Sequence, residues 1–176
     1  MVALQHLKAD GGALINVGSE VSEAVVPLQG MYSASKHAVK GFTDALRVEV
    51  EEIDKAPVSI TLIQPTATNT PFPQHAKNYM DVEPKLPSPI IDPQKVAEAI
   101  LSAATKPTRA IKVGMMAKVN TAASKLMPGM AEKMAAKQSK NLRSDEPPRN
   151  RDGALHIPSE STESGHIYGS GPGSEA

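Results

Sequence analysis

The stretch NVGSEVSEAVVPLQGMYSASKHAVKGF, residues 16–42, connects the end of an apolar segment to the start of a helical pattern. Ser19 ends the apolar segment ALINVGS, residues 13–19, which is bounded by glycine and rich in aliphatic side chains. Tyr32 follows thirteen residues after Ser19, and Lys36 follows four residues after Tyr32. A short apolar run of this kind is typical of a buried strand. The stretch therefore predicts a strand, a loop and a helix in that order.

The helical pattern extends over residues 31–53 and places Tyr32 and Lys36 on one face, because residues four apart in a helix are neighbours. Ligands of open parallel sheets bind beyond the carboxyl ends of the strands, which is where Ser19 stands. We therefore expect Ser19, Tyr32 and Lys36 to meet in one crevice. The apolar residues of the same helix recur at helical spacing and predict a core-facing stripe: Val39, Phe42, Leu46, Val50 and Ile53.

These three side chains suit proton transfer at an oxygen atom. A phenol with the ordinary pKa of about 10 is ionised to about one part in a thousand at neutral pH. The ammonium of Lys36 is expected to lower the pKa of Tyr32, because a nearby positive charge favours the phenolate. Tyr32 would then exchange a proton with a carbonyl or alcohol oxygen that the Ser19 hydroxyl holds in place. Such a site reduces a carbonyl or oxidises an alcohol when a cofactor supplies or accepts the hydride.

The rest of the chain alternates strands with helices. VSITLIQP (58–65) predicts a second strand, and RAIKVGM (109–115) predicts a third. Between them, Asp92 and Pro93 form a helix start, with the aspartate as N-cap and the proline at the first helical position. This alternation implies an α/β fold with a parallel sheet and right-handed crossovers.

The spacing of Ser19, Tyr32 and Lys36, together with the YSASK context, resembles the short-chain dehydrogenases/reductases. The match extends to LIQPTATNTPF and covers residues 1–115. The resemblance implies a Rossmann-like doubly wound sheet, NAD or NADP as cofactor, and a small-molecule alcohol or carbonyl substrate. It also implies that Tyr32 is the catalytic acid/base and that Ser19 orients the substrate. Lys36 would bind the nicotinamide ribose and lower the pKa of Tyr32.

The same resemblance implies a set of nicotinamide contacts after the second strand. The family often has a proline and a glycine after this strand, and then a threonine five residues after the proline. In this chain Pro65 and Thr70 match the proline and the threonine, and Thr66 stands in place of the glycine. The expected cofactor-binding residues are Tyr32, Lys36, Pro65, Thr66, Thr68 and Thr70.

Two segments of the family's cofactor site do not occur in the 176 residues, namely the glycine-rich turn after the first strand and the later Asn-Asn-Ala-Gly segment. We therefore expect the chain to correspond to the C-terminal half of such an enzyme, with about three strands and the N-terminal half missing. Two functions are compatible with this expectation. One is an NAD(P)-dependent oxidoreductase, and the other is a non-catalytic remnant that acts at most as an interaction or oligomerisation module.

Three regions are expected along the chain: a partial Rossmann-like domain over residues 1–115, a helical segment over 116–140, and a disordered tail over 141–176. The last region is rich in Ser, Gly, Pro and charged residues and has few apolar ones. In the helical segment, an apolar stripe lies beside lysines, and we expect it to pack on its own protein, with a membrane surface as the alternative. This stripe comprises Met115, Val119, Ala122, Leu126, Met130 and Met134.

The amino-acid composition argues against several classes of function. Nineteen Lys and Arg balance nineteen Asp and Glu, so the net charge of zero gives no basis for nucleic-acid binding. There is no cysteine, which excludes a disulfide framework and a thiolate metal site and is compatible with a reducing cytoplasm. The five histidines lack metal-ligand spacing, so no metal is expected. No apolar run is long enough for a membrane span.

Two further patterns compete with or add to this interpretation. SASK, residues 33–36, matches the Ser-x-x-Lys motif of penicillin-interacting serine enzymes, but the companion motifs S-D-N and K-T-G do not occur. The helix over residues 31–53 has a second face of small residues, through which the family commonly forms dimers, so a homo-oligomer is expected. That face consists of Ala34, Ala38, Gly41 and Ala45.

Overall fold

A computed structural model of the chain describes residues 2–154 and 166–169. These residues form two compact units. The first unit contains the residues up to Thr66 together with Gln94–Lys133, and the second contains Ala67–Pro93 together with the residues from Met134 onward. The chain therefore leaves the first unit after the second strand and returns to it near the start of a long helix.

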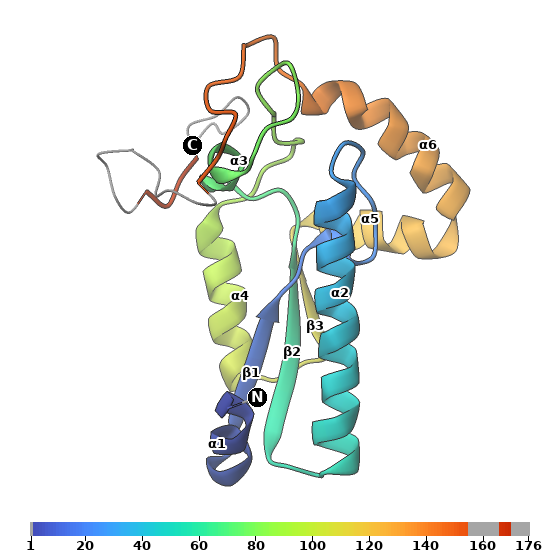
Figure 1. Ribbon diagram of the computed structural model, residues 1–176. Coiled ribbons are helices and arrows are strands. Elements are labelled where there is room, and N and C mark those ends of the chain that lie inside the picture. Colours follow the sequence, from blue (N-terminus) through green and yellow to red (C-terminus); the bar gives the residue numbers. More distant parts are fainter. Residues whose placement is uncertain (1, 155–165, 170–176) are drawn as a thin grey trace. The chain divides into compact units, whose positions relative to one another are not determined.

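The three predicted strands and the two helices between them occur in the expected order, and the short helix Phe72–His75 and the short turns were not predicted (Figure 1). The strands are β1 (Gly12–Val17), β2 (Val58–Pro65) and β3 (Ala110–Val113). The α-helices are α1 (Val2–Asp10), α2 (Gly30–Arg47), α3 (Phe72–His75), α4 (Pro93–Thr105), α5 (Met115–Leu126) and α6 (Pro128–Gln138). Two 3₁₀ turns, η1 (Glu20–Ser22) and η3 (Ser139–Leu142), and one π-helical turn, η2 (Val48–Ile53), complete the order.

The three strands form one parallel sheet in the order β1–β2–β3. In its register, Leu14 lies opposite Ile60 and Ile63 lies opposite Ile111. In Figure 1, α2 and α4 run along the strands on their two sides. The predicted α/β fold, with a three-stranded parallel sheet and flanking helices, is confirmed.

The core lies where the C-terminal part of α2 covers β2. Leu46 and Val50 pack with Val58 and Ile60, and each of these four residues is at most 5% exposed to solvent. Burying aliphatic side chains of this size is the main favourable contribution to folding. The core therefore fixes the direction of α2, and with it the position of the helix start that carries Tyr32.

The core-facing stripe predicted for α2 is only partly correct. Ile53 is 70% exposed, because the helix widens into the π-helical turn η2 and the spacing of 3.6 residues per turn no longer applies there. Phe42 is also exposed, and the inward position beside it belongs to Thr43, whose hydroxyl accepts a hydrogen bond from Asn16 at 2.9 Å. A polar contact thus replaces an apolar one in the middle of the helix.

The part of the predicted stripe that lies on α5 is on the exposed side of that helix. Ala117 and Thr121 are the buried residues of α5, whereas Met115 and Leu126 are 71% and 80% exposed. These apolar residues of α5 therefore do not pack within the first unit, contrary to the expectation that the stripe packs on its own protein. The polar contacts that cause this orientation are described below.

In the second unit, residues 141–154 contact the loop that follows α3. Pro84 and Arg143 form an isolated antiparallel bridge, and the amide of Lys85 donates to the carbonyl oxygen of Leu142. Leu142 is buried although its surroundings in the sequence are polar. Composition suggests that this segment is part of a disordered tail. In the structure, residues 141–154 instead make contacts through the buried side chain of Leu142 and several backbone hydrogen bonds. The remainder of that expected tail, 155–165 and 170–176, lies outside the described residues.

No helix in the described part of the chain combines the length and the apolar character that crossing a membrane requires.

Candidate functional site

Ser19 stands where the chain leaves β1 and enters the turn η1. Its hydroxyl accepts a hydrogen bond from the amide of Val21 at 3.3 Å, and its own amide donates to the hydroxyl of Ser22 at 3.1 Å. This reciprocal pair is a capping box, which fixes the backbone on both sides of Ser19. Gly18 is required just before it, since an added Cβ would lie 2.8 Å from the Ser22 hydroxyl and 3.0 Å from Leu62.

Tyr32 and Lys36 reach the same place from the first turns of α2. The Tyr32 hydroxyl forms a hydrogen bond with the Ser19 side chain. The Lys36 ammonium lies 5.8 Å from the centroid of the Tyr32 ring and donates to the carbonyl oxygen of Val17 at 3.2 Å. The structure thus brings together the three side chains that sequence spacing selected, at the carboxyl end of β1.

The electrostatics of Tyr32 differ from the expectation. Burial raises the pKa of the Tyr32 phenol above its ordinary value, the hydrogen bond with Ser19 opposes this shift, and the negative charge of Glu20 adds to it. Burial also lowers the pKa of Lys36. Sequence reasoning expected Lys36 to lower the pKa of Tyr32, but here the ammonium lies over the ring and donates to Val17. Burial, rather than the charge of Lys36, therefore sets the direction of the shift in the pKa of Tyr32.

Glu20 is a component of the site that sequence reasoning missed. The carboxylate is buried, and it accepts hydrogen bonds from the hydroxyl of Thr66 and from the side-chain amide of Asn120, both at 3.0 Å. Burial raises the pKa of Glu20 above its ordinary value, although the hydrogen bonds from Asn120 and Thr66 oppose the shift. Because Glu20 follows Ser19 directly, it connects the serine turn to the end of β2 and to α5.

Glu23 forms a second acidic centre three residues later. It accepts a hydrogen bond from Gln64 at 3.2 Å and forms ion pairs with Lys125 at 2.7 Å and Lys112 at 3.4 Å. Although burial acts to raise the pKa of Glu23, hydrogen bonds from Lys125 and Gln64 and the two lysine charges bring it below its ordinary value. The sequence contained one feature that could have identified both residues. Two glutamates stand in the segment EVSE, residues 20–23, directly after the serine at the end of the strand.

The expected nicotinamide contacts divide between the two units. Pro65 is the last residue of β2, and Thr66 follows it with its amide donating to the carbonyl oxygen of Val113 at 3.0 Å. Thr68 and Thr70 belong to the second unit, where Thr68 forms an isolated parallel bridge with Ile91. Pro65 and Thr66 therefore share a unit with Ser19, Tyr32 and Lys36, and the hydroxyl of Thr66 is already bound to Glu20.

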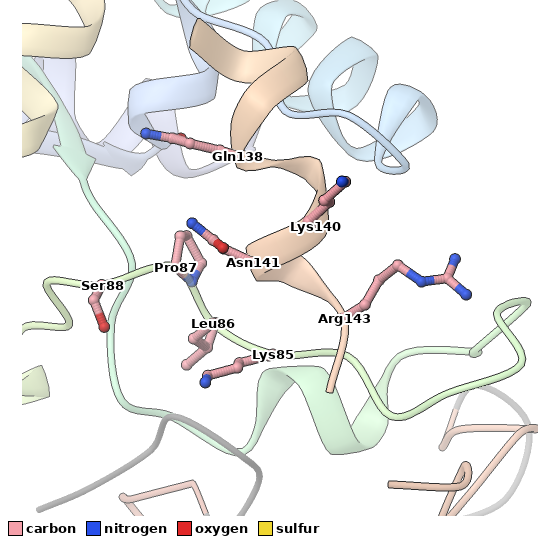
Figure 2. Close-up of a pocket in the computed structure, with 8 residues that line it drawn as sticks. All are labelled: Lys85, Leu86, Pro87, Ser88, Gln138, Lys140, Asn141 and Arg143. Atoms are coloured by element: carbon pink, nitrogen blue, oxygen red, sulfur yellow. The ribbon is translucent and has the colours of Figure 1, made fainter. Parts of the chain in front are cut away.

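A pocket within the second unit has a partly basic lining (Figure 2). Gln138 and Asn141 point to one side of the segment that carries them, whereas Lys140 and Arg143 point to the other. Arg143 also forms an ion pair with Asp81. Because the positive charges do not converge, we assign no ligand to this pocket. Its lining consists of Lys85, Leu86, Pro87, Ser88, Gln138, Lys140, Asn141 and Arg143.

Comparisons with known proteins agree with this geometry. The short chain dehydrogenase family profile matches residues 1–80. The uncharacterized oxidoreductase YxnA of Bacillus subtilis is 39% identical over 138 residues, which cover 77% of this chain and 38% of YxnA. The 3-ketodihydrosphingosine reductase of Bacteroides thetaiotaomicron is 42% identical over 65 residues, which cover 37% of this chain and 23% of that enzyme.

Among solved structures, a short chain dehydrogenase from Burkholderia cenocepacia in complex with NADP superimposes with a TM-score of 0.61. It is 23% identical, and the match covers 75% of this chain and 50% of that one. The chain thus spans about half the length of this structure and less than half of YxnA. The strand-end serine, the Tyr-x-x-x-Lys helix, the parallel sheet and these matches together show that the chain belongs to the short-chain dehydrogenase/reductase family.

Proposed function

We propose that this chain carries the proton-transfer half of an NAD(P)-dependent oxidoreductase that interconverts an alcohol and a carbonyl compound. The observation that supports this proposal is the hydrogen bond between Ser19 and Tyr32, one helical turn from Lys36, at the carboxyl end of β1. The hydroxyls of Ser19 and Tyr32 would hold one substrate oxygen between them. This arrangement provides two donors at the atom where negative charge develops during reduction.

In the direction of reduction, Tyr32 gives its proton to the carbonyl oxygen while Ser19 donates a hydrogen bond to the same atom. The phenol is protonated at neutral pH because its ordinary pKa is about 10, and burial, which raises that pKa, makes release of the proton harder. The phenolate that remains is balanced by the Lys36 ammonium, which lies 5.8 Å from the ring centroid. In the direction of oxidation, the same groups act in reverse, and Tyr32 accepts the proton of the alcohol.

A nicotinamide cofactor, when bound, supplies or accepts the hydride. The polar groups near Tyr32 suit its nicotinamide and ribose end: the Lys36 ammonium is a donor for ribose hydroxyls, and Pro65 and Thr66 stand at the end of the neighbouring strand. We extend the proposed set to Thr68 and Thr70 from the family resemblance. NADP in the Burkholderia cenocepacia structure supports a dinucleotide of this class. The cysteine-free sequence supports a reducing compartment, and we propose the cytoplasm.

A second candidate function is a non-catalytic module. It is favoured by β1, which pairs only with β2 among the described strands. A strand that lacks a neighbour on one side is a template for association with another chain. The small-residue face of α2 adds to this possibility, because Ala34, Ala38 and Gly41 are exposed and a side chain at Gly41 would meet open space.

Two experiments separate these functions. Calorimetric titration of the 176-residue chain with NADH and NADPH is expected to show no saturable binding at micromolar concentration, since the pyrophosphate is normally held by a glycine-rich turn and a helix N-terminus. Micromolar binding by a monodisperse monomer would contradict the module and favour a self-sufficient enzyme. Size-exclusion chromatography with light scattering on the same sample is expected to show self-association.

Catalysis is tested in a polypeptide in which a glycine-rich dinucleotide-binding segment precedes these residues. Tyr32→Phe is expected to lower turnover of carbonyl substrates at least about 100-fold, the usual contribution of a general acid. Tyr79→Phe is the matched control, since Tyr79 is 84% exposed in the second unit. Turnover of the Tyr32 variant equal to that of the control would refute the role of Tyr32.

A further inference from the structure

Helix α5 is held by its polar side. The side-chain amide of Asn120 donates to buried Glu20 at 3.0 Å, and Lys125 forms an ion pair with Glu23 at 2.7 Å. Both glutamates lie in or next to the turn η1, so two polar contacts five residues apart fix the rotation of α5 about its own axis. The polar side of the helix therefore faces the protein.

The inward surface between these contacts has room only for small side chains. Ala117 and Thr121 are fully buried, and Thr121 accepts a hydrogen bond from Lys112 of β3. A rotation that brought the larger apolar residues inward would break the contacts of Asn120 and Lys125 and would place methionine or leucine where alanine now fits. Packing of this density does not accommodate such a change.

The apolar side of α5 consequently lies on the surface and continues into the first turn of α6. We name this surface the methionine stripe. Its residues recur every three or four positions along α5 and are all exposed, which makes a contiguous apolar patch rather than scattered single residues. The methionine stripe consists of Met115, Val119, Ala122, Leu126, Met127 and Met130.

Positive charge accompanies the stripe. Residues 115–140 contain five lysines and one glutamate, a net charge of +4, in a chain whose total is zero. Lys118 and Lys125 are seven residues apart, so they lie two turns apart along one edge of the stripe, where Lys118 adds positive charge and the charge of Lys125 is balanced by Glu23. Both are exposed, and Lys133 of α6 is exposed beyond them.

We propose that the methionine stripe docks on an anionic phospholipid surface. Exposed apolar residues flanked by lysines on a helix are the pattern of interfacial helices, whose apolar side enters the acyl boundary while the lysines meet anionic headgroups. A second copy of the same stripe would bring positive edges together, which opposes pairing. This docking is independent of the proposed catalytic function.

Flotation with lipid vesicles tests the proposal, because protein aggregates stay at the bottom of the gradient. The full chain is expected to float with vesicles of phosphatidylcholine that contain roughly one third phosphatidylserine, and not with phosphatidylcholine alone. Leu126→Gln is expected to lower the partition coefficient about tenfold, since the leucine side chain no longer enters the acyl boundary. Leu101→Gln is the matched control, since Leu101 is 68% exposed on α4 and lies outside the stripe.

Charge is tested separately with Lys118→Glu, which is expected to reduce flotation with the anionic vesicles, as is added salt. Absence of flotation with anionic vesicles, or equal losses in the Leu126 and Leu101 variants, would overturn the proposal. A change in the oligomeric state of the Leu126 variant without lipid, combined with unchanged flotation, would show instead that the stripe is covered by a second copy. Circular dichroism confirms that each variant folds, as expected from the similar helix propensities of leucine and glutamine.

Discussion

Helices α2 and α5 both contact the turn that follows Ser19, but they are held by opposite kinds of side chains. The C-terminal half of α2 buries Leu46 against the sheet, in agreement with its apolar periodicity. Helix α5 turns Asn120 toward Glu20 and leaves Leu126 exposed. An apolar stripe thus predicts that a helix is amphipathic. It does not determine which side of the helix faces the protein when a buried carboxylate can accept hydrogen bonds from the polar side.

The largest expected effect separates the two helices directly. Leu46→Ala is expected to lower the free energy of unfolding by about 2–5 kcal/mol, because it leaves a cavity in the core. Leu126→Ala, the same change on the exposed side of α5, is expected to stay within about 0.5 kcal/mol of the parent. Urea denaturation followed by circular dichroism measures both. Equal decreases in the free energy of unfolding would mean that the apolar side of α5 is packed against the rest of the protein.

Arg47 tests whether α2 also depends on a polar anchor. Its buried guanidinium donates to the carbonyl oxygens of Ile60 at 3.0 Å and Arg109 at 2.9 Å and pairs with Asp44 at 2.6 Å. Arg47→Ala is expected to cost about 3 kcal/mol, since it leaves buried acceptors without a donor. Lys40→Ala removes the other, more exposed helical partner of Asp44 and is expected to cost about 0.3–0.5 kcal/mol.

Asn120 provides the corresponding test on α5. Asn120→Ala removes one of the donors to the buried Glu20 carboxylate and is expected to cost about 1–3 kcal/mol in urea denaturation at neutral pH. Val119→Ala changes the neighbouring residue on the exposed side and is expected to cost less than about 0.5 kcal/mol. A reversed order of the two losses would show that the polar contact does not orient the helix.

The smallest expected effect is a change in pH dependence. Because the pKa of Glu20 is raised on folding, the folded chain binds more protons than the unfolded chain above the ordinary glutamate pKa of about 4.3, and stability falls as pH rises through the raised value. Glu20→Gln is expected to remove that fall. Denaturation in urea at a series of pH values from mildly acidic to neutral measures it.

Glu23 supplies the opposite sign in the same experiment. Its pKa is lowered on folding by Lys125, Gln64 and Lys112 against the effect of burial, so its contribution is present above the ordinary value and is lost as pH falls through the lowered one. Glu23→Gln is expected to reduce stability at neutral pH and to weaken the acid dependence. Identical pH profiles for the two glutamine variants would contradict the distinction between the two carboxylates.

Local chemistry accounts for the parts of the structure that sequence reasoning predicted. Pro93 begins α4, as its place after an aspartate indicates, and β2 ends at Pro65. The approach of Tyr32 and Lys36 to Ser19 follows from helical periodicity and from the common direction of parallel strands. Each of these features depends on residues within about one helical turn of each other or on a rule of parallel sheets.

The features that escaped prediction depend on partners distant in the sequence. Glu20 and Asn120 are 100 residues apart, and neither carries a local signal that names the other. The direction of the Tyr32 pKa shift depends on the depth of burial, which a spacing pattern does not reveal. The π-helical turn η2 departs from the 3.6-residue spacing on which the stripe was based, and Ile53 at its end is exposed.

The register of the sheet has a consequence for the order of events during synthesis. Gly12 of β1 pairs with Val58 of β2, and Leu62 of β2 pairs with Ala110 of β3. The two paired residues are therefore more than forty positions apart in the sequence in both cases, and the earlier strand is made well before the later one. At translation rates of about 5–20 residues per second, about 2–9 s pass between the synthesis of β1 and that of its partner β2. Parallel pairing of this kind forms slowly because long loops must close first. β1 therefore stays without its partner strand for seconds during synthesis, and an unpaired strand is open to association with another chain.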